Sequence, residues 1–109
     1  MTNLAIIPAR GGSKRIPRKN IRPFRGQPII AHVIRTALEC SAFAEVMVST
    51  EDREIAGIAK ECGASVPFMR SAATAGDEAT TLDVLREVIA AYRKAGRDFD
   101  ALCCIYPTA

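Results

Sequence analysis

The chain has 109 residues, 49% hydrophobic and 25% charged, with a formal net charge of +3. This length suits one domain, or part of one, and the composition excludes a disordered or low-complexity chain. The apolar runs are far shorter than the ~20 residues that a membrane span needs, and no signal-peptide pattern precedes them, so we expect a cytoplasmic protein without a membrane partner.

The first predicted elements are a strand, a basic loop and a helix. Residues 4–9 form an apolar run that stops at a Gly-rich polar segment, as a strand buried on both faces does. From Pro28 to Cys40, apolar residues recur at helical spacing, which predicts an amphipathic helix.

The middle of the chain repeats this order. Residues 45–49 are a predicted strand. Thr50 is the expected N-cap of a helix, because three acidic residues follow in what would be its first turn, and Gly63 is the expected terminator. Residues 65–69 are a predicted third strand.

The last predicted elements are a helix and a strand. Apolar residues between 82 and 92 keep helical spacing, Gly96 is the expected C-cap, and residues 101–106 are a predicted fourth strand. The order βαβαβαβ predicts an α/β fold, a Rossmann-like three-layer sandwich with a parallel sheet. Ligands bind such sheets beyond the carboxyl ends of the strands, so we expect the loops that follow the strands to meet at one edge.

The cysteines and the single histidine do not have the spacing of a zinc site. Adjacent Cys103 and Cys104 would point to opposite faces of a strand. We therefore predict that these two and Cys40 and Cys62 are buried free thiols rather than disulfides.

The positive charge is concentrated in the loop after the first strand. Residues 10–19 carry five basic residues and no acid, whereas the remainder of the chain has a net charge of −2. Its two glycines allow backbone N–H groups to approach phosphate oxygens, and its cations can neutralise a triphosphate. Neither GxGxxG nor the closing Gly-Lys-Ser/Thr of a P-loop is present, which counts against dinucleotide binding and ordinary ATPase chemistry. Nucleic-acid binding would use a broader basic surface, so a phosphate-binding loop is favoured.

Residues 6–20, with the sequence IIPARGGSKRIPRKN, resemble the signature of the acylneuraminate cytidylyltransferase family. The resemblance continues through residues 24–30, 46–50, 66–70 and 103–109. It therefore covers essentially the whole chain. The segments most similar to the members that act on pseudaminic acid are residues 66–70, 77–81 and 103–106.

The resemblance implies a fold of the nucleotide-diphospho-sugar transferase type and a reaction. CTP and a nonulosonic acid would give the CMP-sugar and pyrophosphate, with Mg²⁺ assisting and pseudaminic acid as the favoured acceptor. It also implies that residues 1–109 are a single nucleotide-binding portion lacking the C-terminal half of the family, which holds the metal-binding aspartates and a dimer interface. We therefore expect no metal ligand in this stretch, little activity from it alone, and a homodimer at full length.

The resemblance also assigns residues to the site. Together with Gly11 and Gly12 of the loop, the residues expected to bind the nucleotide are Ala9, Arg10, Ser13, Lys14, Lys19, Asn20, Arg70, Ala79 and Thr81. Arg10 and Lys19 are the expected catalytic residues, because they would face the charge that develops on the transferred phosphate and pyrophosphate. Arg70, Ala79 and Thr81 match positions that hold cytosine and ribose. Tyr106 stands where members that act on sialic acid have a Gln beside the sugar, and it is the expected sugar-binding residue.

Several alternatives remain at this point. Instead of binding a ligand, Arg70 could be a surface cation and Tyr106 could be a packed aromatic residue. Asp52 and Asp77 suit helix capping better than metal binding. N-acetylneuraminate and legionaminate are the alternative acceptor sugars. A non-catalytic module that binds phosphate or nucleic acid is the alternative function outside the enzymes.

Overall fold

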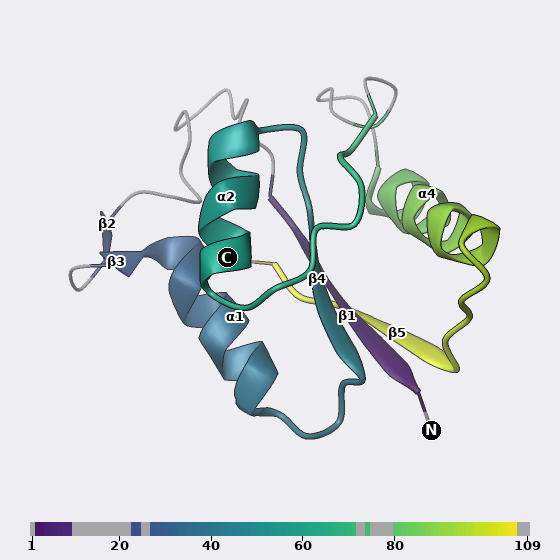
Figure 1. Cartoon of the computed structure of the whole chain (residues 1–109), viewed down its shortest axis with the longest axis horizontal. Coiled ribbons are helices and arrows are strands. Elements are labelled where there is room, and N and C mark those ends of the chain that lie inside the picture. The colour runs from purple at the N-terminus through teal and green to yellow at the C-terminus, as the bar shows by residue number, and fades with distance from the viewer. Residues whose placement is uncertain (1, 10–22, 25–26, 72–73, 75–79, 107–109) are drawn as a thin grey trace.

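The computed structural model describes residues 2–9, 23–24, 27–71, 74 and 80–106 (Figure 1). Within them the elements are, in chain order, β1 (Asn3–Pro8), β2 (Pro23–Phe24), β3 (Gln27–Pro28), α1 (Ile29–Glu39), β4 (Glu45–Ser49), α2 (Arg53–Glu61), α4 (Thr81–Lys94) and β5 (Ala101–Cys104). Among the helices of this described part, none is long and apolar enough to cross a membrane.

β1 is the central strand of the main sheet. The described strands of this sheet are parallel and follow the order β4-β1-β5. Ala5 of β1 stands opposite Val46 of β4 and Cys103 of β5. Because β1 has a neighbour on each side and helices on both faces, its side chains are apolar without alternation, as the sequence predicts. The short strands β2 and β3 form a separate antiparallel pair.

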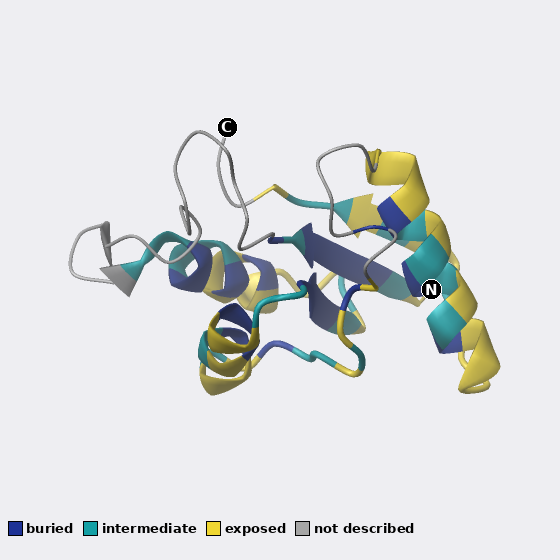
Figure 2. Ribbon diagram, turned by 90° about the horizontal axis from the view of Figure 1, so that it is seen from above, coloured by how far each residue is buried: buried dark blue, intermediate teal, exposed yellow. Residues whose placement is uncertain are grey.

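The two faces of the sheet pack against different helices. Ala5 and Ile7 belong to the core formed with α1 and α2, whereas Leu4 and Ile6 belong to the core formed with α4. All four are 0% exposed, and burial of an Ile or Leu side chain contributes about 1.5–3 kcal/mol. Figure 2 shows the buried residues gathered on the strands between the helices. The predicted three-layer sandwich is therefore confirmed.

The start of α2 differs from the prediction by two residues. Asp52, not Thr50, is the N-cap, and its carboxylate accepts hydrogen bonds from the backbone N–H groups of Glu54 at 2.8 Å and Ile55 at 3.1 Å. Thr50 is still attached to the sheet edge, because its carbonyl accepts from Arg70 N, and its hydroxyl accepts from Asp52 N at 3.1 Å. The chain needs two more residues to leave the sheet before the helix can begin.

The third helix and the role of both glycines at helix ends are confirmed, although the C-cap of α4 is Ala95 and Gly96 is the residue after it. Gly63 has φ of +99° and Gly96 has φ of +81°, which L residues with a Cβ rarely adopt. α4 begins with a capping box, in which the Thr80 hydroxyl accepts from Asp83 N and the Asp83 carboxylate accepts from Thr80 N.

The predicted third strand is absent, although the segment follows the outer side of β4. Ser65 makes a single parallel bridge to Met47, with Ser65 N donating to Val46 O and Val48 N to Ser65 O. Pro67 has no N–H to continue the ladder. The fourth strand is shorter than predicted, since β5 ends at Cys104.

The prediction of buried thiols is wrong for two of the four free cysteines. Cys40 and Cys103 are exposed, and Cys62 and Cys104 are partly buried. Cys40 caps the end of α1. Cys103 lies opposite Ala5 on β5, an edge strand of the described sheet. Because α1 and α2 pack over β1 and β4, they do not cover Cys103.

Candidate functional site

Strands β1 and β4 end side by side at the carboxyl edge of the sheet. Ala9 N donates a hydrogen bond to Ser49 O at 2.9 Å, and the Ala9 side chain is buried. Ala9, the residue before the basic loop, therefore lies beside the end of β4. The predicted site residues Arg10, Gly11, Gly12, Ser13, Lys14, Lys19, Asn20 and Ala79 lie outside the described residues, and their roles stay predictions.

Arg70 is fixed to this same edge. Its guanidinium donates from Nε to Ser49 Oγ at 3.2 Å and from Nη2 to Ser49 O at 2.9 Å, and its backbone N donates to Thr50 O at 2.8 Å. The residue is only 6% exposed, so the alternative of a surface cation is wrong. A buried guanidinium is costly unless its donors are satisfied, and Ser49 satisfies two of them. Ser49 O thus joins Ala9, at the start of the basic loop, to Arg70.

The segment that follows Arg70 is held by α4. Glu87 accepts hydrogen bonds from Ser71 N at 3.2 Å, from Thr74 Oγ1 at 2.8 Å and from the Ser71 hydroxyl. Burial raises the pKa of Glu87, but the hydrogen bonds from Ser71 and Thr74 and the charge of Arg70 outweigh it, and the net pKa lies below the ordinary value. The sequence does not predict this role of Glu87, because its contacts span 13 and 16 positions along the chain.

Thr81 and Tyr106 meet where α4 begins and the chain leaves β5. Their hydroxyl groups form a hydrogen bond, and Tyr106 is 56% exposed. The alternative of a packed aromatic is therefore wrong for the described surroundings of Tyr106. Burial raises the pKa of the neighbouring Cys104 thiol, against the lowering effects of a hydrogen bond with Tyr106 and the charge of Arg70.

At the carboxyl edge, Ser49 thus contacts both Ala9 and Arg70, and Thr81 contacts Tyr106 where the chain leaves β5. The predicted convergence of the loops is confirmed for Ala9, Ser49 and Arg70, and stays a prediction for Tyr106. Hydroxyl groups and a buried cation offer hydrogen bonds to a polar, anionic ligand.

The donors in the described part do not fit a metal site. No three His, Cys, Asp or Glu side chains of the described ranges gather where they could hold an ion. The carboxylate of Asp52 caps α2, and Asp77 lies outside the described residues.

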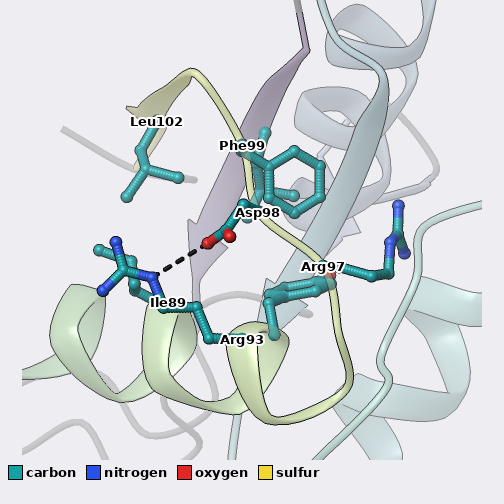
Figure 3. A pocket seen from close by; sticks show the side chains of 8 residues that line it. Ile89, Arg93, Arg97, Asp98, Phe99 and Leu102 are labelled. Carbon is teal, nitrogen blue, oxygen red and sulfur yellow. Dashed lines mark hydrogen bonds and ion pairs between the residues drawn. The ribbon is translucent and has the colours of Figure 1, made fainter.

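A small cavity lies at the opposite end of the sheet (Figure 3). It has a volume of about 70 Å³ and is lined by Leu4, Ile89, Tyr92, Arg93, Arg97, Asp98, Phe99 and Leu102. Arg97 bonds Glu45 at 2.7 Å and lies 5.6 Å from the Tyr92 ring centroid, and Arg93 bonds Asp98 at 3.0 Å. Because both guanidinium groups have carboxylate partners, this cavity is a structural gap rather than the candidate site.

A parallel α/β sandwich with a basic segment after its central strand, and a buried arginine hydrogen-bonded to the end of the neighbouring strand β4, defines a Rossmann-like nucleotide-binding fold. The sequence profile of the cytidylyltransferase family matches residues 4–95, so the chain belongs to this family.

Known proteins similar to the chain agree with this assignment. It is 45% identical over 109 residues to pseudaminic acid cytidylyltransferase of Campylobacter jejuni, covering 100% of this chain and 47% of that protein. It is 40% identical over 109 residues to CMP-N,N'-diacetyllegionaminic acid synthase of Legionella pneumophila, with the same shares covered. The structure of CMP:2-keto-3-deoxy-manno-octonic acid synthetase complexed with CTP has a TM-score of 0.79 at 29% identity, over 98% of this chain and 40% of that one. The chain spans about half the length of the curated relatives (47%).

Proposed function

We propose that the chain is the nucleotide-binding portion of an enzyme that transfers CMP from CTP to a nonulosonic acid. The observation that carries this proposal is the meeting of Ala9, the residue before the basic loop, and buried Arg70 on Ser49, in a chain of the cytidylyltransferase family. The similar synthetase solved with CTP supports the nucleotide. The term "whole protein" denotes below a protein of the relatives' length that contains this chain.

In the proposed reaction, the anomeric hydroxyl oxygen of the sugar attacks the α-phosphorus of CTP. The new bond joins this oxygen to phosphorus, the bond to the pyrophosphate oxygen breaks, and the hydroxyl proton passes to solvent or a base. Arg10 and Lys19 stabilise the charge that develops on the phosphates, with Ser13, Lys14 and Asn20 beside them. Arg70, Ala79 and Thr81 hold the cytosine and ribose.

Nucleotidyltransferases of this kind commonly use a divalent metal, and Mg²⁺ is the proposed one. The described residues do not supply its ligands, so no step is assigned to it.

Pseudaminic acid is the proposed acceptor. The identity of 45% to a pseudaminic acid enzyme, against 40% to a legionaminic acid enzyme, supports this order, with legionaminate and N-acetylneuraminate as alternatives. Exposed Tyr106 is the proposed sugar-side residue of this chain. The proposal also includes a homodimeric, cytoplasmic enzyme with CTP and the sugar, not nucleic acid, as its partners.

The proposal is tested by pyrophosphate release from the whole protein with CTP and a panel of nonulosonic acids. We expect release that depends on the acceptor and is fastest with pseudaminic acid. Equal rates with legionaminate or N-acetylneuraminate would remove the assignment of the sugar. No acceptor-dependent release with any of them would remove the proposed function itself.

A further inference from the structure

Glu87 connects helix α4 to the chain that follows Arg70. One carboxylate oxygen accepts from Ser71 N at 3.2 Å and from Thr74 Oγ1 at 2.8 Å, and the other accepts from the Ser71 hydroxyl. The Thr74 hydroxyl also lies 3.4 Å from Ser71 O. A single side chain therefore holds both Ser71 and Thr74.

Thr74 is buried, so its hydrogen bond to Glu87 matters for its position. Thr74 is only 7% exposed. A buried hydroxyl or N–H group without an acceptor carries a desolvation cost, which favours the arrangement in which Glu87 is present. Because the net pKa of Glu87 is lowered, its side chain is an ionised carboxylate near neutral pH. Hydrogen bonds to an ionised acceptor are stronger than those to a neutral one.

Arg70 is thereby held from two directions. On one side, Ser49 and Thr50 of the sheet edge bind its guanidinium and its backbone N–H. On the other side, the next residue, Ser71, is bound to α4 through Glu87. Without Glu87 the sheet contacts would remain, but the chain direction after Arg70 would no longer be fixed to the helix.

The same helix also holds the far end of this connection. The capping box of Thr80 and Asp83 fixes the entry into α4, and Thr81 is its first residue. Ser71, which follows Arg70, and Thr80, which precedes Thr81, are thus both bonded to α4, through Glu87 and Asp83. Arg70 and Thr81 are two of the residues to which the cytosine and ribose contacts are assigned.

We infer that Glu87 is a positioning residue for the base side of the nucleotide: it does not touch the ligand, but holds Ser71 and Thr74 and so fixes the direction of the backbone directly after Arg70. This inference rests on the proposed function, because the ligand assigned to Arg70 is the proposed CTP.

The test compares wild type, Glu87→Ala and Glu87→Gln in the whole protein, with kcat and KM for CTP and for UTP. The two nucleotides differ only in the base, so their kcat/KM ratio reports base positioning. We expect Glu87→Ala to reduce the CTP preference by roughly tenfold, chiefly through KM for CTP, since small displacements of binding groups have large kinetic effects. Glu87→Gln should lie between, because its amide oxygen still accepts from Ser71 or Thr74 while its NH₂ group faces the other donors.

Two further variants keep the test decisive. Glu61→Ala removes an exposed glutamate from α2 and should leave the CTP preference unchanged. Thr74→Val removes one donor to Glu87 at nearly constant volume, and it should shift the preference in the same direction even if Glu87→Ala does not fold.

An unchanged CTP preference in Glu87→Ala and Thr74→Val overturns the inference, even if both variants melt at a lower temperature, because the role would then be structural only. A wild-type protein that does not prefer CTP contradicts the proposed function instead. The two failures are therefore distinguishable.

Discussion

Replacement of Ser49 by alanine removes one of the two side-chain hydrogen bonds that hold Arg70. The bond from Arg70 Nε to Ser49 Oγ is 3.2 Å long, whereas the bond from Nη2 to Ser49 O, at 2.9 Å, uses the backbone and survives the change. Hydrogen bonds to charged groups contribute about 1.5–3 kcal/mol when buried. Because this one is long and the guanidinium keeps another partner, we expect the free energy of unfolding to fall by about 1.5 kcal/mol.

A double-mutant cycle with Arg70→Met separates this bond from other effects of the serine. In the Arg70→Met background the Ser49 hydroxyl has lost its charged donor, so Ser49→Ala should cost about 1 kcal/mol less than in wild type. Urea unfolding of the whole protein, followed by far-UV circular dichroism, measures all four proteins. Ser41→Ala, an exposed serine, is the control and should stay within about 0.5 kcal/mol of wild type. Equal costs of Ser49→Ala in the two backgrounds would refute the assigned role of the bond.

Three other predictions concern single residues. The pKa of Glu87 is lowered in the folded state, so the carboxylate stabilises the fold above its unfolded pKa, and this stabilisation is lost as pH falls through the folded pKa. As the pH is lowered into the acid range, the urea midpoint of Glu87→Gln should therefore fall less steeply than that of wild type. Tyr106→Phe removes the hydroxyl that bonds Thr81 at an exposed site, and should raise KM for the sugar with little change in KM for CTP; steady-state kinetics that show the reverse would move Tyr106 to the nucleotide side. Lys19→Ala should lower kcat by about two to three powers of ten, whereas Arg18→Ala should have a modest effect that fades with added salt; a raised KM for CTP with unchanged kcat would make Lys19 a binding residue.

The sheet and its helices were predictable because local patterns determine them. The apolar run of β1 indicated a strand buried on both faces, and Leu4 to Ile7 are indeed completely buried. Gly63 and Gly96 marked helix ends because a positive φ is costly for other residues. These features depend on neighbours in sequence, and a single sequence contains that information.

The errors arise where contacts between distant residues decide the outcome. Thr50 and Asp52 are both common N-cap residue types, but Thr50 is held by the sheet edge through Arg70, 20 positions away. Residues 65–69 have strand propensity, yet Pro67 and the outer position beside β4 leave a single bridge. Glu87 has no local signal at all, because its partners become neighbours only when α4 packs on the sheet.

The central claim, transfer of CMP from CTP, is tested most directly by following two phosphorus labels in the whole protein. With pseudaminic acid present, label in the α-phosphate of CTP should move to the sugar product, and label in the γ-phosphate should appear in pyrophosphate. Appearance of the γ-phosphate label on the sugar, with CDP as the other product, would mean phosphoryl rather than nucleotidyl transfer and would contradict the account.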